Sequence, residues 1–402
     1  MINTNRLVYP CVIVILVYLY WYTYTHTVCL PGNLRSLQLP SSFLSGRQLN
    51  STTVLDTEEF RHVGKEIQMV DTGGKIMTWF HPEDSDTIVF LHMQKTGGSY
   101  FLKKLYTLDV GTPCQLRSKR RLMGKESTFC PRPGDSPYKD TWIFSTLTFG
   151  WVCGLHPTWT EYNGCVPTFM DRQFGARKRR YMYITILRHP VARFASEYLH
   201  ARRGATWFYK HKCRNSVMSP DKVPPCYKGY YDGESWPDLT FEKFISCPYN
   251  QGFNRQTMML ADLTLIGCYR NMRSLTKSHK DTLLASAKLN LLRKFSSFAI
   301  NEYLSESQIL LEYQFGRKFL DLFEGKDNER MKSGDLVAYI FKNRELYDKV
   351  VELNQLDMEL YKYALELFSS RLATLGVTLD VNKLQNEINE SPIDEQSVQE
   401  QL

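Results

Sequence analysis

The feature that most constrains the fold is the stretch 87–109, where an apolar run meets a glycine-bearing turn. Thr87–Met93 is rich in β-branched and aromatic residues and is long enough for one buried strand. Gln94–Ser99 follows with a lysine, two hydroxyl side chains and two adjacent glycines. Apolar residues then recur at helical spacing. The pattern predicts a strand, a tight turn and the N-terminus of a helix.

Such a junction can bind oxyanions. Free backbone N–H groups and the helix dipole favour negative charge, Gly97 and Gly98 let the backbone approach closely, and Lys95 adds a positive charge. The alternative is an ordinary connection with an incidental lysine. Lys95 and Thr96 precede the two glycines, whereas a Walker A loop places its glycines first. The order therefore does not fit a P-loop nucleoside triphosphatase.

A second strand–helix junction lies within Tyr181–His200. An apolar run ends at Leu187, Arg188 follows, and Pro190 suits the first turn of a helix. Ligands of open parallel sheets bind beyond the carboxyl ends of the strands, so we expect Lys95 and Arg188 on the same edge. A salt bridge at the helix start is the alternative role for Arg188.

Strand-like and helix-like segments alternate between about residues 80 and 375, which favours a single α/β domain with a central parallel sheet flanked by helices. With 43% hydrophobic residues, the chain can fill the core of such a domain. The expected strands are Thr87–His92, Tyr181–Leu187 and Ser297–Ile300. The expected helices are Val191–Ala201, Phe241–Ile245, Asp281–Phe295, Ser305–Phe323 and Arg344–Leu372.

An uncharged segment near the N-terminus predicts a membrane anchor. Leu7–Tyr24 carries no charge, and at about 1.5 Å per residue it is just long enough for the hydrocarbon core of a bilayer. Its final Tyr and Trp residues are typical of a membrane interface. Because bulky aromatics leave no small-residue cleavage site, we expect an uncleaved signal anchor over residues 7–25 rather than a cleaved signal peptide. Arg6 favours a cytoplasmic tail at residues 1–6.

The segments that flank the folded domain differ from it in composition. Residues 26–79 lack periodicity and are interpreted as a luminal stem, with a glycosylation sequon at Asn50-Ser51-Thr52. Residues 376–402 are polar, and we expect a poorly ordered tail there.

Eight of the ten cysteines lie between residues 114 and 268 in closely spaced twos. They form neither a CxxC pair nor a zinc spacing, so metal binding has little support. In a secretory protein they would form a disulfide framework. Sequence cannot fix the connectivity, but we expect sequential pairing. The pairs would be Cys114–Cys130, Cys153–Cys165, Cys213–Cys226 and Cys247–Cys268.

The net charge of +8 is concentrated in the middle of the chain. Basic clusters lie at Arg117–Arg121, Arg177–Arg180 and Arg188–Arg203. They suit a polyanionic ligand such as a nucleotide, a sulfated glycan or a nucleic acid. A solvated surface is the alternative for each cluster.

Together these motifs resemble the heparan sulfate 6-O-sulfotransferase family. The run Phe-Leu-His-Met-Gln-Lys-Thr-Gly-Gly-Ser is similar to its 5′-phosphosulfate loop, and Arg188 with Ser196 to its 3′-phosphate-binding segment. Further similarities lie at 150–161, 203–207, 247–268 and 353–361. The resemblance covers about residues 85–370, but 110–140 matches poorly. His189 departs from the family, which usually has an acidic residue there.

The resemblance implies a sulfotransferase domain that uses 3′-phosphoadenosine 5′-phosphosulfate as donor and needs no metal. Its P-loop-like phosphosulfate loop would consist of Lys95, Thr96, Gly97, Gly98 and Ser99. Lys95 would also stabilise the departing phosphate, while Arg188 and Ser196 would hold the 3′-phosphate. Removing the proton of a sugar hydroxyl calls for a base, for which we expect His156, with His92 as second candidate.

The implied acceptor is heparan sulfate and not a nucleic acid. We expect acceptor contacts from His92, Arg202, Arg203, Trp207 and Arg255, although a solvated basic face would explain the arginines nearly as well. The sequence thus predicts a Golgi type II membrane enzyme that sulfates the 6-hydroxyl of glucosamine. The alternatives are a uronosyl 2-O-sulfotransferase and a non-catalytic, membrane-anchored glycan-binding protein.

Overall fold

A computed structural model describes most of the chain beyond residue 78. The described residues are 79–122, 125–135, 139–154, 156–203, 212–213, 216–217, 224, 226, 236–269, 274–324, 333–390 and 398. The expected anchor at 7–25, the stem up to residue 78 and Trp207 lie outside these ranges. Within them, no helix is both long and apolar enough to cross a membrane.

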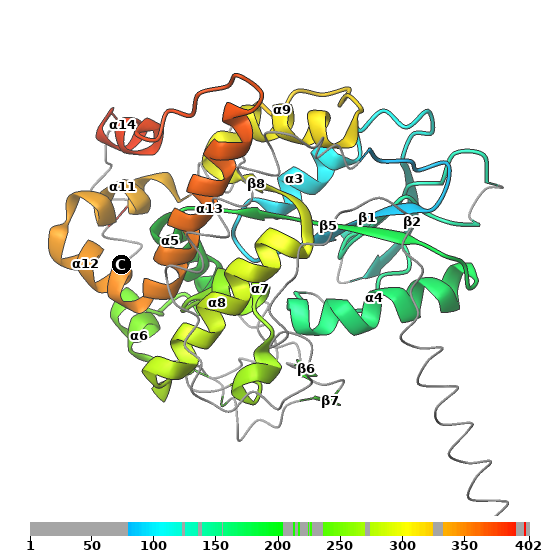
Figure 1. Ribbon diagram of the computed structural model, residues 1–402. Helices are drawn as coiled ribbons and strands as arrows, with labels where there is room; N and C mark the ends of the chain where they lie inside the picture. The colour runs from blue at the N-terminus through cyan, green and yellow to red at the C-terminus, as the bar shows by residue number, and fades with distance from the viewer. Residues whose placement is uncertain are drawn as a thin grey trace, which may run out of the picture. The chain divides into compact units, whose positions relative to one another are not determined.

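The centre of the fold is a four-stranded parallel sheet with the strand order β4-β1-β5-β8. Figure 1 labels three of these strands, β1, β5 and β8. Its strands are β1 (Asp86–Leu91), β4 (Ile143–Phe144), β5 (Arg180–Leu187) and β8 (Phe295–Ile300). The expected parallel sheet and its three expected strands are confirmed, each strand starting one or two residues earlier than expected. The short strand β4 was not expected, because two residues carry no periodic signal.

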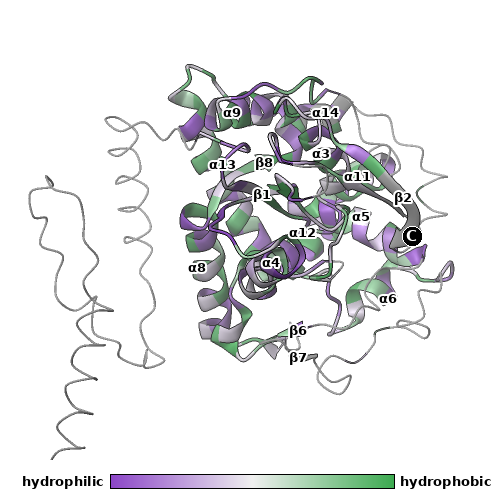
Figure 2. Cartoon of the chain, turned by 90° about the vertical axis from the view of Figure 1, so that its right-hand side faces the viewer, coloured by the Kyte–Doolittle hydropathy of each residue, from purple (hydrophilic) through white to green (hydrophobic). Residues whose placement is uncertain are grey.

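Both faces of the sheet are buried, and alternate residues of β1 enter two different cores. Ile88 and Phe90 pack with α3 (Gly98–Leu105) and α9 (Leu304–Phe315). Val89 and Leu91 belong to the larger core, with residues of α4, α5, α8 and α13. These helices span Trp159–Phe174, Pro190–Arg202, Lys277–Arg293 and Gln355–Ala373. In Figure 2 the outer helices α4 and α8 carry both hydrophobic and hydrophilic residues, as helices with one buried face do.

Three expected helices end elsewhere than the sequence indicates. The single helix expected over Arg344–Leu372 is wrong, because Asn354 separates α12 (Arg344–Leu353) from α13. The helix expected up to Phe323 stops at Phe315, where Gly316 adopts a left-handed φ of 64°. Helix α8 ends at Arg293, and Phe295, expected in that helix, begins β8.

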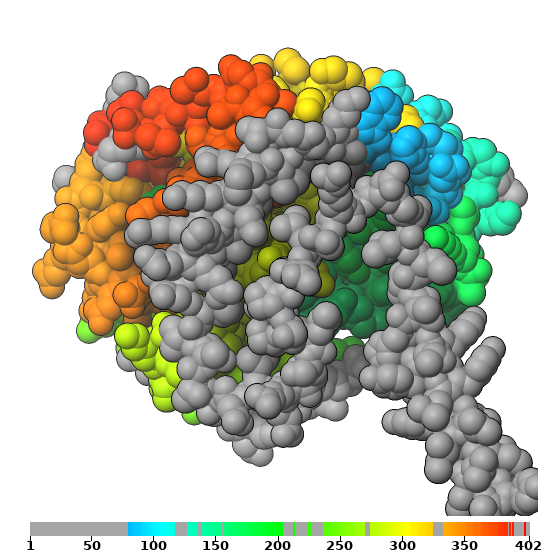
Figure 3. Space-filling view, viewed as in Figure 1, coloured from blue at the N-terminus to red at the C-terminus, as the bar shows by residue number. Residues whose placement is uncertain are grey.

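The remaining elements lie around this framework. Short helices are α6 (Phe241–Ser246), α7 (Arg255–Leu260), α11 (Gly334–Lys342) and α14 (Lys383–Glu390), with 3-10 turns η4 (Leu263–Ile266) and η6 (Asn301–Tyr303). The region after residue 375, expected to be poorly ordered, contains α14, whose Ile388 is buried and which contacts α11. Figure 3 shows α13 (orange-red) beside α9 (yellow) on the surface, in agreement with their contacts.

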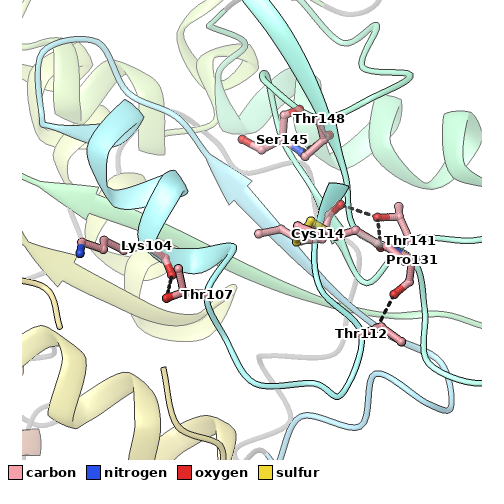
Figure 4. Close-up of a disulfide and its surroundings, with 10 residues drawn as sticks. Lys104, Thr107, Thr112, Cys114, Pro131, Thr141, Ser145 and Thr148 are labelled. Carbon is pink, nitrogen blue, oxygen red and sulfur yellow. Dashed lines mark hydrogen bonds between the residues drawn. A yellow bond between two sulfur atoms is a disulfide. The ribbon is translucent and has the colours of Figure 1, made fainter. Parts of the chain in front are cut away.

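Two antiparallel hairpins and four disulfides complete the described part. The hairpins pair β2 (Gln115–Leu122) with β3 (Lys125–Phe129) and β6 (Lys212–Cys213) with β7 (Ser216–Val217). Cys114–Cys130 and Cys153–Cys165 are confirmed. The first ties β2 to β3, and Figure 4 shows it beside the hydrogen bond from Thr112 Oγ1 to the carbonyl of Pro131.

The other two expected pairs are wrong, because the bonds are Cys213–Cys268 and Cys226–Cys247. Cys213 ends β6, which contacts α4, and the bond brings it to Cys268 just after η4, 55 residues further along the chain. Proximity in sequence therefore does not decide this pairing.

Candidate active site

The loop after β1 has the conformation that an anion-binding turn needs. Lys95 has a φ of 62° and Gly97 one of 83°, both in the left-handed region. That region is uncommon for a lysine, and such backbone strain gathers at functional sites. Lys95 is 8% exposed. Thr96 is buried and donates from Oγ1 to the carbonyl of Met93 at 3.2 Å, which closes the turn before α3 begins at Gly98.

Both glycines of the loop are required by close neighbours. A Cβ atom on Gly97 would lie 2.2 Å from Nδ2 of Asn301. On Gly98 it would lie 2.1 Å from Cδ2 of His92. A side chain at either position would force its neighbour to shift, and Gly97 in addition has a left-handed φ, so both positions favour glycine. Ser99 follows as the second residue of α3 and is partly exposed.

Arg188 lies against the same loop. It follows β5 directly, is 5% exposed and donates from Nη1 to the carbonyl of Lys95 at 3.2 Å. Gln256 fixes its backbone, because the Arg188 N–H donates to Oε1 and Nε2 donates to the Arg188 carbonyl, both at 2.9 Å. The expectation that Lys95 and Arg188 share one edge of the sheet is confirmed. Ser196 is buried on α5, and its contact with a phosphate stays a prediction.

His156 is held with one ring nitrogen ready to accept a proton. Nδ1 lies 3.1 Å from the carbonyl oxygen of His92, the residue that follows β1. A carbonyl only accepts, so Nδ1 carries the hydrogen and Nε2 keeps its lone pair. The ring centroids of His92 and His156 are 5.1 Å apart. Burial, and then the charge of His92, hold the pKa of His156 well below its usual value. The imidazole is therefore neutral at physiological pH.

A half-buried acid, Glu161, and a buried arginine, Arg255, interact beside the start of α4. Glu161 accepts the Thr158 N–H at 2.8 Å in a capping box at the start of α4, and burial raises its pKa to about 7. Arg255, the first residue of α7, is 4% exposed, and its Nε has no hydrogen-bond partner in the described structure. The positive charge of Arg255 lowers the pKa of Glu161, against the effect of burial, and it also lowers the pKa of His156.

Helix α7 therefore influences both His156 and Arg188. The charge of Arg255 lowers the pKa of His156, and the next residue, Gln256, holds Arg188. Gln256 and Glu161 both lie in segments that carry the family resemblance, but the sequence indicates no role for either. Gln256 has its partner, Arg188, after β5, so no local pattern identifies it. Glu161 belongs to the capping-box pattern with Thr158, which indicates the start of a helix and not a place in the site.

His189, the departure from the family pattern, is embedded in a polar and aromatic cluster. Its N–H donates to Oε1 of Glu302 at 2.9 Å, and the Tyr361 hydroxyl donates to Oε2 of the same carboxylate at 2.9 Å. Its ring lies 5.1 Å from that of Phe341. Burial, and then the charge of Arg188, lower the pKa of His189 to about 3. A carboxylate from η6 thus lies beside this junction, although the chain has no acid at position 189.

The remaining expected acceptor contacts lie at the end of α5. Arg202 donates from Nη2 to the carbonyl of Pro237 at 2.9 Å, and Arg203 is exposed. His200, two residues earlier, is near enough for its charge to lower the pKa of His156. Trp207 lies outside the described residues. In the part of the chain that the structure describes, no three His, Cys, Asp or Glu side chains gather as metal ligands would.

Comparison with known proteins agrees with this geometry. The sulfotransferase family profile matches residues 80–364. Heparan-sulfate 6-O-sulfotransferase 2 of Danio rerio is 40% identical over 300 residues, covering 73% of this chain and 60% of that protein. Heparan-sulfate 6-O-sulfotransferase 1-B of Danio rerio is 37% identical over 337 residues, covering 83% of this chain and 77% of that protein. Heparan-sulfate 6-O-sulfotransferase 3 of Mus musculus is 38% identical over 298 residues, covering 73% of this chain and 59% of that protein.

This chain thus spans about three fifths of the length of two of these relatives and over three quarters of the third. The identities extend over most of the chain, and the family profile covers the whole sheet together with Lys95, His156 and Arg188. On these grounds the chain belongs to the heparan-sulfate 6-O-sulfotransferase family.

Proposed function

We propose that this protein transfers a sulfuryl group from 3′-phosphoadenosine 5′-phosphosulfate to the 6-hydroxyl of glucosamine in heparan sulfate. The observation that carries the proposal is the double role of His92. Its carbonyl fixes the proton on Nδ1 of His156, and its ring packs against Gly98 of the anion-binding loop. The base and the loop are thereby joined through one residue, as a transfer between a hydroxyl and a bound phosphosulfate requires.

The residues around the loop fit the donor. Lys95 in its left-handed conformation, and two glycines with no room for a Cβ, form a cradle that suits the 5′-phosphosulfate. Thr96 and Ser99 would complete it. Arg188 would hold the 3′-phosphate with its fork of N–H donors, together with Ser196 on α5. When bound, the donor supplies the sulfuryl group and a leaving group, adenosine 3′,5′-bisphosphate.

His156 would act as the general base. Its Nε2 would take the proton of the 6-hydroxyl while Nδ1–H stays bonded to the His92 carbonyl, which stabilises the imidazolium that forms. The lowered pKa keeps Nε2 unprotonated in a mildly acidic compartment. Lys95 would offset the negative charge that grows on the departing phosphate. Neither step calls for a metal ion.

Arg255 supports an anionic acceptor. Burying a guanidinium whose Nε has no hydrogen-bond acceptor costs free energy unless a ligand supplies the acceptor. Heparan sulfate carries carboxylates and sulfates that can accept such a bond. His92, Arg202, Arg203 and Trp207 would add further contacts to the glycan chain.

The four disulfides favour a secretory compartment. We therefore place the protein in the Golgi as a single-pass type II membrane protein, with residues 7–25 as anchor and the domain at 80–375 in the lumen. Fluorescence microscopy of the tagged full-length chain with a Golgi marker tests this assignment. A cytosolic or nuclear distribution would contradict it.

Product analysis tests the reaction itself. The purified full-length protein would be incubated with radiolabelled donor and with heparins desulfated at single positions, and the product disaccharides then separated. Label on carbon 6 of glucosamine is the expected result. Label on carbon 2 of the uronate would identify a uronosyl 2-O-sulfotransferase instead. Heparin binding without any transfer would favour the glycan-binding alternative.

A further inference from the structure

Strand β8 is followed by a polar residue that lies beside the anion-binding loop Lys95–Ser99. β1, β5 and β8 are neighbours in the sheet, and they lead into Lys95, Arg188 and Asn301. Asn301 follows β8 directly and is 3% exposed. We propose that Asn301 is a nucleotide-binding residue, and that its side-chain oxygen accepts a hydrogen bond from the ribose 2′-hydroxyl of the sulfate donor. The inference rests on the proposed donor.

The side chain of Asn301 lies directly on the loop. Its Nδ2 is only 2.2 Å from the point that a Cβ of Gly97 would occupy, so the amide packs against the backbone of the cradle. Its Oδ1 is buried and has no hydrogen-bond partner in the described structure. Buried amide oxygens are almost always paired, and an exception calls for a ligand or another explanation. The carboxylate of the neighbouring Glu302 already has hydrogen-bond partners, because it accepts from the His189 N–H and from the Tyr361 hydroxyl.

The chemistry of the donor limits what can pair with this oxygen. An amide oxygen only accepts hydrogen bonds. The phosphate and sulfate oxygens of the ionised donor accept as well, which leaves the ribose 2′-hydroxyl and the adenine amino group as hydrogen-bond donors.

The ribose carries both the 5′ and the 3′ substituents, so it must lie between the loop at Lys95 and Arg188. These two residues are themselves in contact. Through its contact with Gly97, Asn301 lies beside the expected position of the ribose. The 2′-hydroxyl is next to the carbon that bears the 3′-phosphate, whereas the adenine extends beyond the ribose. The geometry therefore favours the hydroxyl.

Calorimetric titration of the full-length protein with two ligands tests the inference. Adenosine 3′,5′-bisphosphate should bind roughly tenfold more tightly than its 2′-deoxy analogue, the difference expected for one buried hydrogen bond. Asn301→Ala should bind both ligands within about twofold of each other. Asn301→Leu, which fills the same space without an acceptor, gives the same expectation if the alanine variant is unstable. Asn290→Ala is the matched control, because Asn290 is buried on α8 and bonds to the carbonyl of Leu260.

The outcomes distinguish a failure of the Asn301 contact from a failure of the proposed donor. If the Asn301 variants keep the preference for the ribose, or if the unaltered protein has none, Asn301 does not bind the 2′-hydroxyl. If the variants instead lose a preference for adenosine over inosine 3′,5′-bisphosphate, the oxygen binds the adenine amino group and the inference is wrong. If the unaltered protein binds no bisphosphate at all, the proposed donor fails first.

Discussion

At the scale of single residues, the candidate site depends on backbone groups as much as on side chains. The His92 carbonyl sets the protonated nitrogen of His156, and the Lys95 carbonyl receives the guanidinium of Arg188. The sequence indicated Lys95, Arg188 and His156 because each stands at a recognisable junction or motif. It could not indicate Asn301, since only the fold brings residue 301 against Gly97.

Replacing Lys95 or Arg188 by alanine should abolish turnover and weaken binding of adenosine 3′,5′-bisphosphate by roughly 10- to 100-fold, because each removes a charge-assisted contact to a phosphate. Calorimetric titration measures the binding. Lys103→Ala, an exposed lysine on the same helix α3, is the matched control and should bind normally. Unchanged affinity in either site variant would remove that residue from the cradle.

Acid should destabilise the protein partly through His189. Its folded-state pKa of about 3 lies below the ordinary histidine pKa of 6.5. Between these values the unfolded chain binds a proton that the folded protein excludes, so stability is full above pH 6.5 and falls as the pH drops toward 3. His189→Gln should flatten the decline of melting temperature between pH 6.5 and 4, measured by circular dichroism. An equally steep decline in the variant would contradict this assignment.

At the scale of elements, the predicted strands were correct where a long apolar run made the pattern clear, as in β1 and β5. The break between α12 and α13 was missed for a physical reason. Asn354 Oδ1 accepts the N–H of Asn254, a residue 100 positions away, and no local pattern records such a partner. Helix α7 depends on the same region, since Asp357 of α13 accepts the N–H groups of Gln256 and Thr257 at 3.0 and 2.7 Å.

Asp357→Ala should therefore lower the free energy of unfolding by about 3–5 kcal/mol, because it also leaves the buried Arg193 with one acidic neighbour fewer. Urea denaturation measures this change. Asp348→Ala, an exposed acid on α12, is the control and should change stability by less than about 0.5 kcal/mol. A small effect at Asp357 would show that α7 is held by packing rather than by these bonds.

At the scale of the whole molecule, the disulfides link the elements that carry the site. Cys153–Cys165 closes a loop that contains His156 and Glu161, whereas Cys114–Cys130 closes the hairpin of β2 and β3. The sequence indicated a disulfide framework from the spacing of the cysteines. It could not decide the two remaining pairs, because Cys213 and Cys268 lie 55 positions apart in the sequence.

Opening the Cys153–Cys165 loop with two serines should cost about 3 kcal/mol of stability and reduce turnover more than bisphosphate binding, because His156, the proposed base, loses its constraint. Thermal melting, sulfate transfer and calorimetry measure the three effects. The same change at Cys114 and Cys130 is the control, and there turnover should fall less. Equal losses of turnover in both variants would mean that the loop around His156 has no special role.

The most direct test of the central claim compares sulfate transfer with nucleotide binding in His156→Ala. If His156 is the base held by the His92 carbonyl, transfer in a single turnover should slow by roughly 10²- to 10⁴-fold. The affinity for adenosine 3′,5′-bisphosphate should stay within about twofold, since the cradle of Lys95 and Arg188 is intact. Transfer at a near-normal rate would contradict the account and assign the base to another group, with His92 the first to examine.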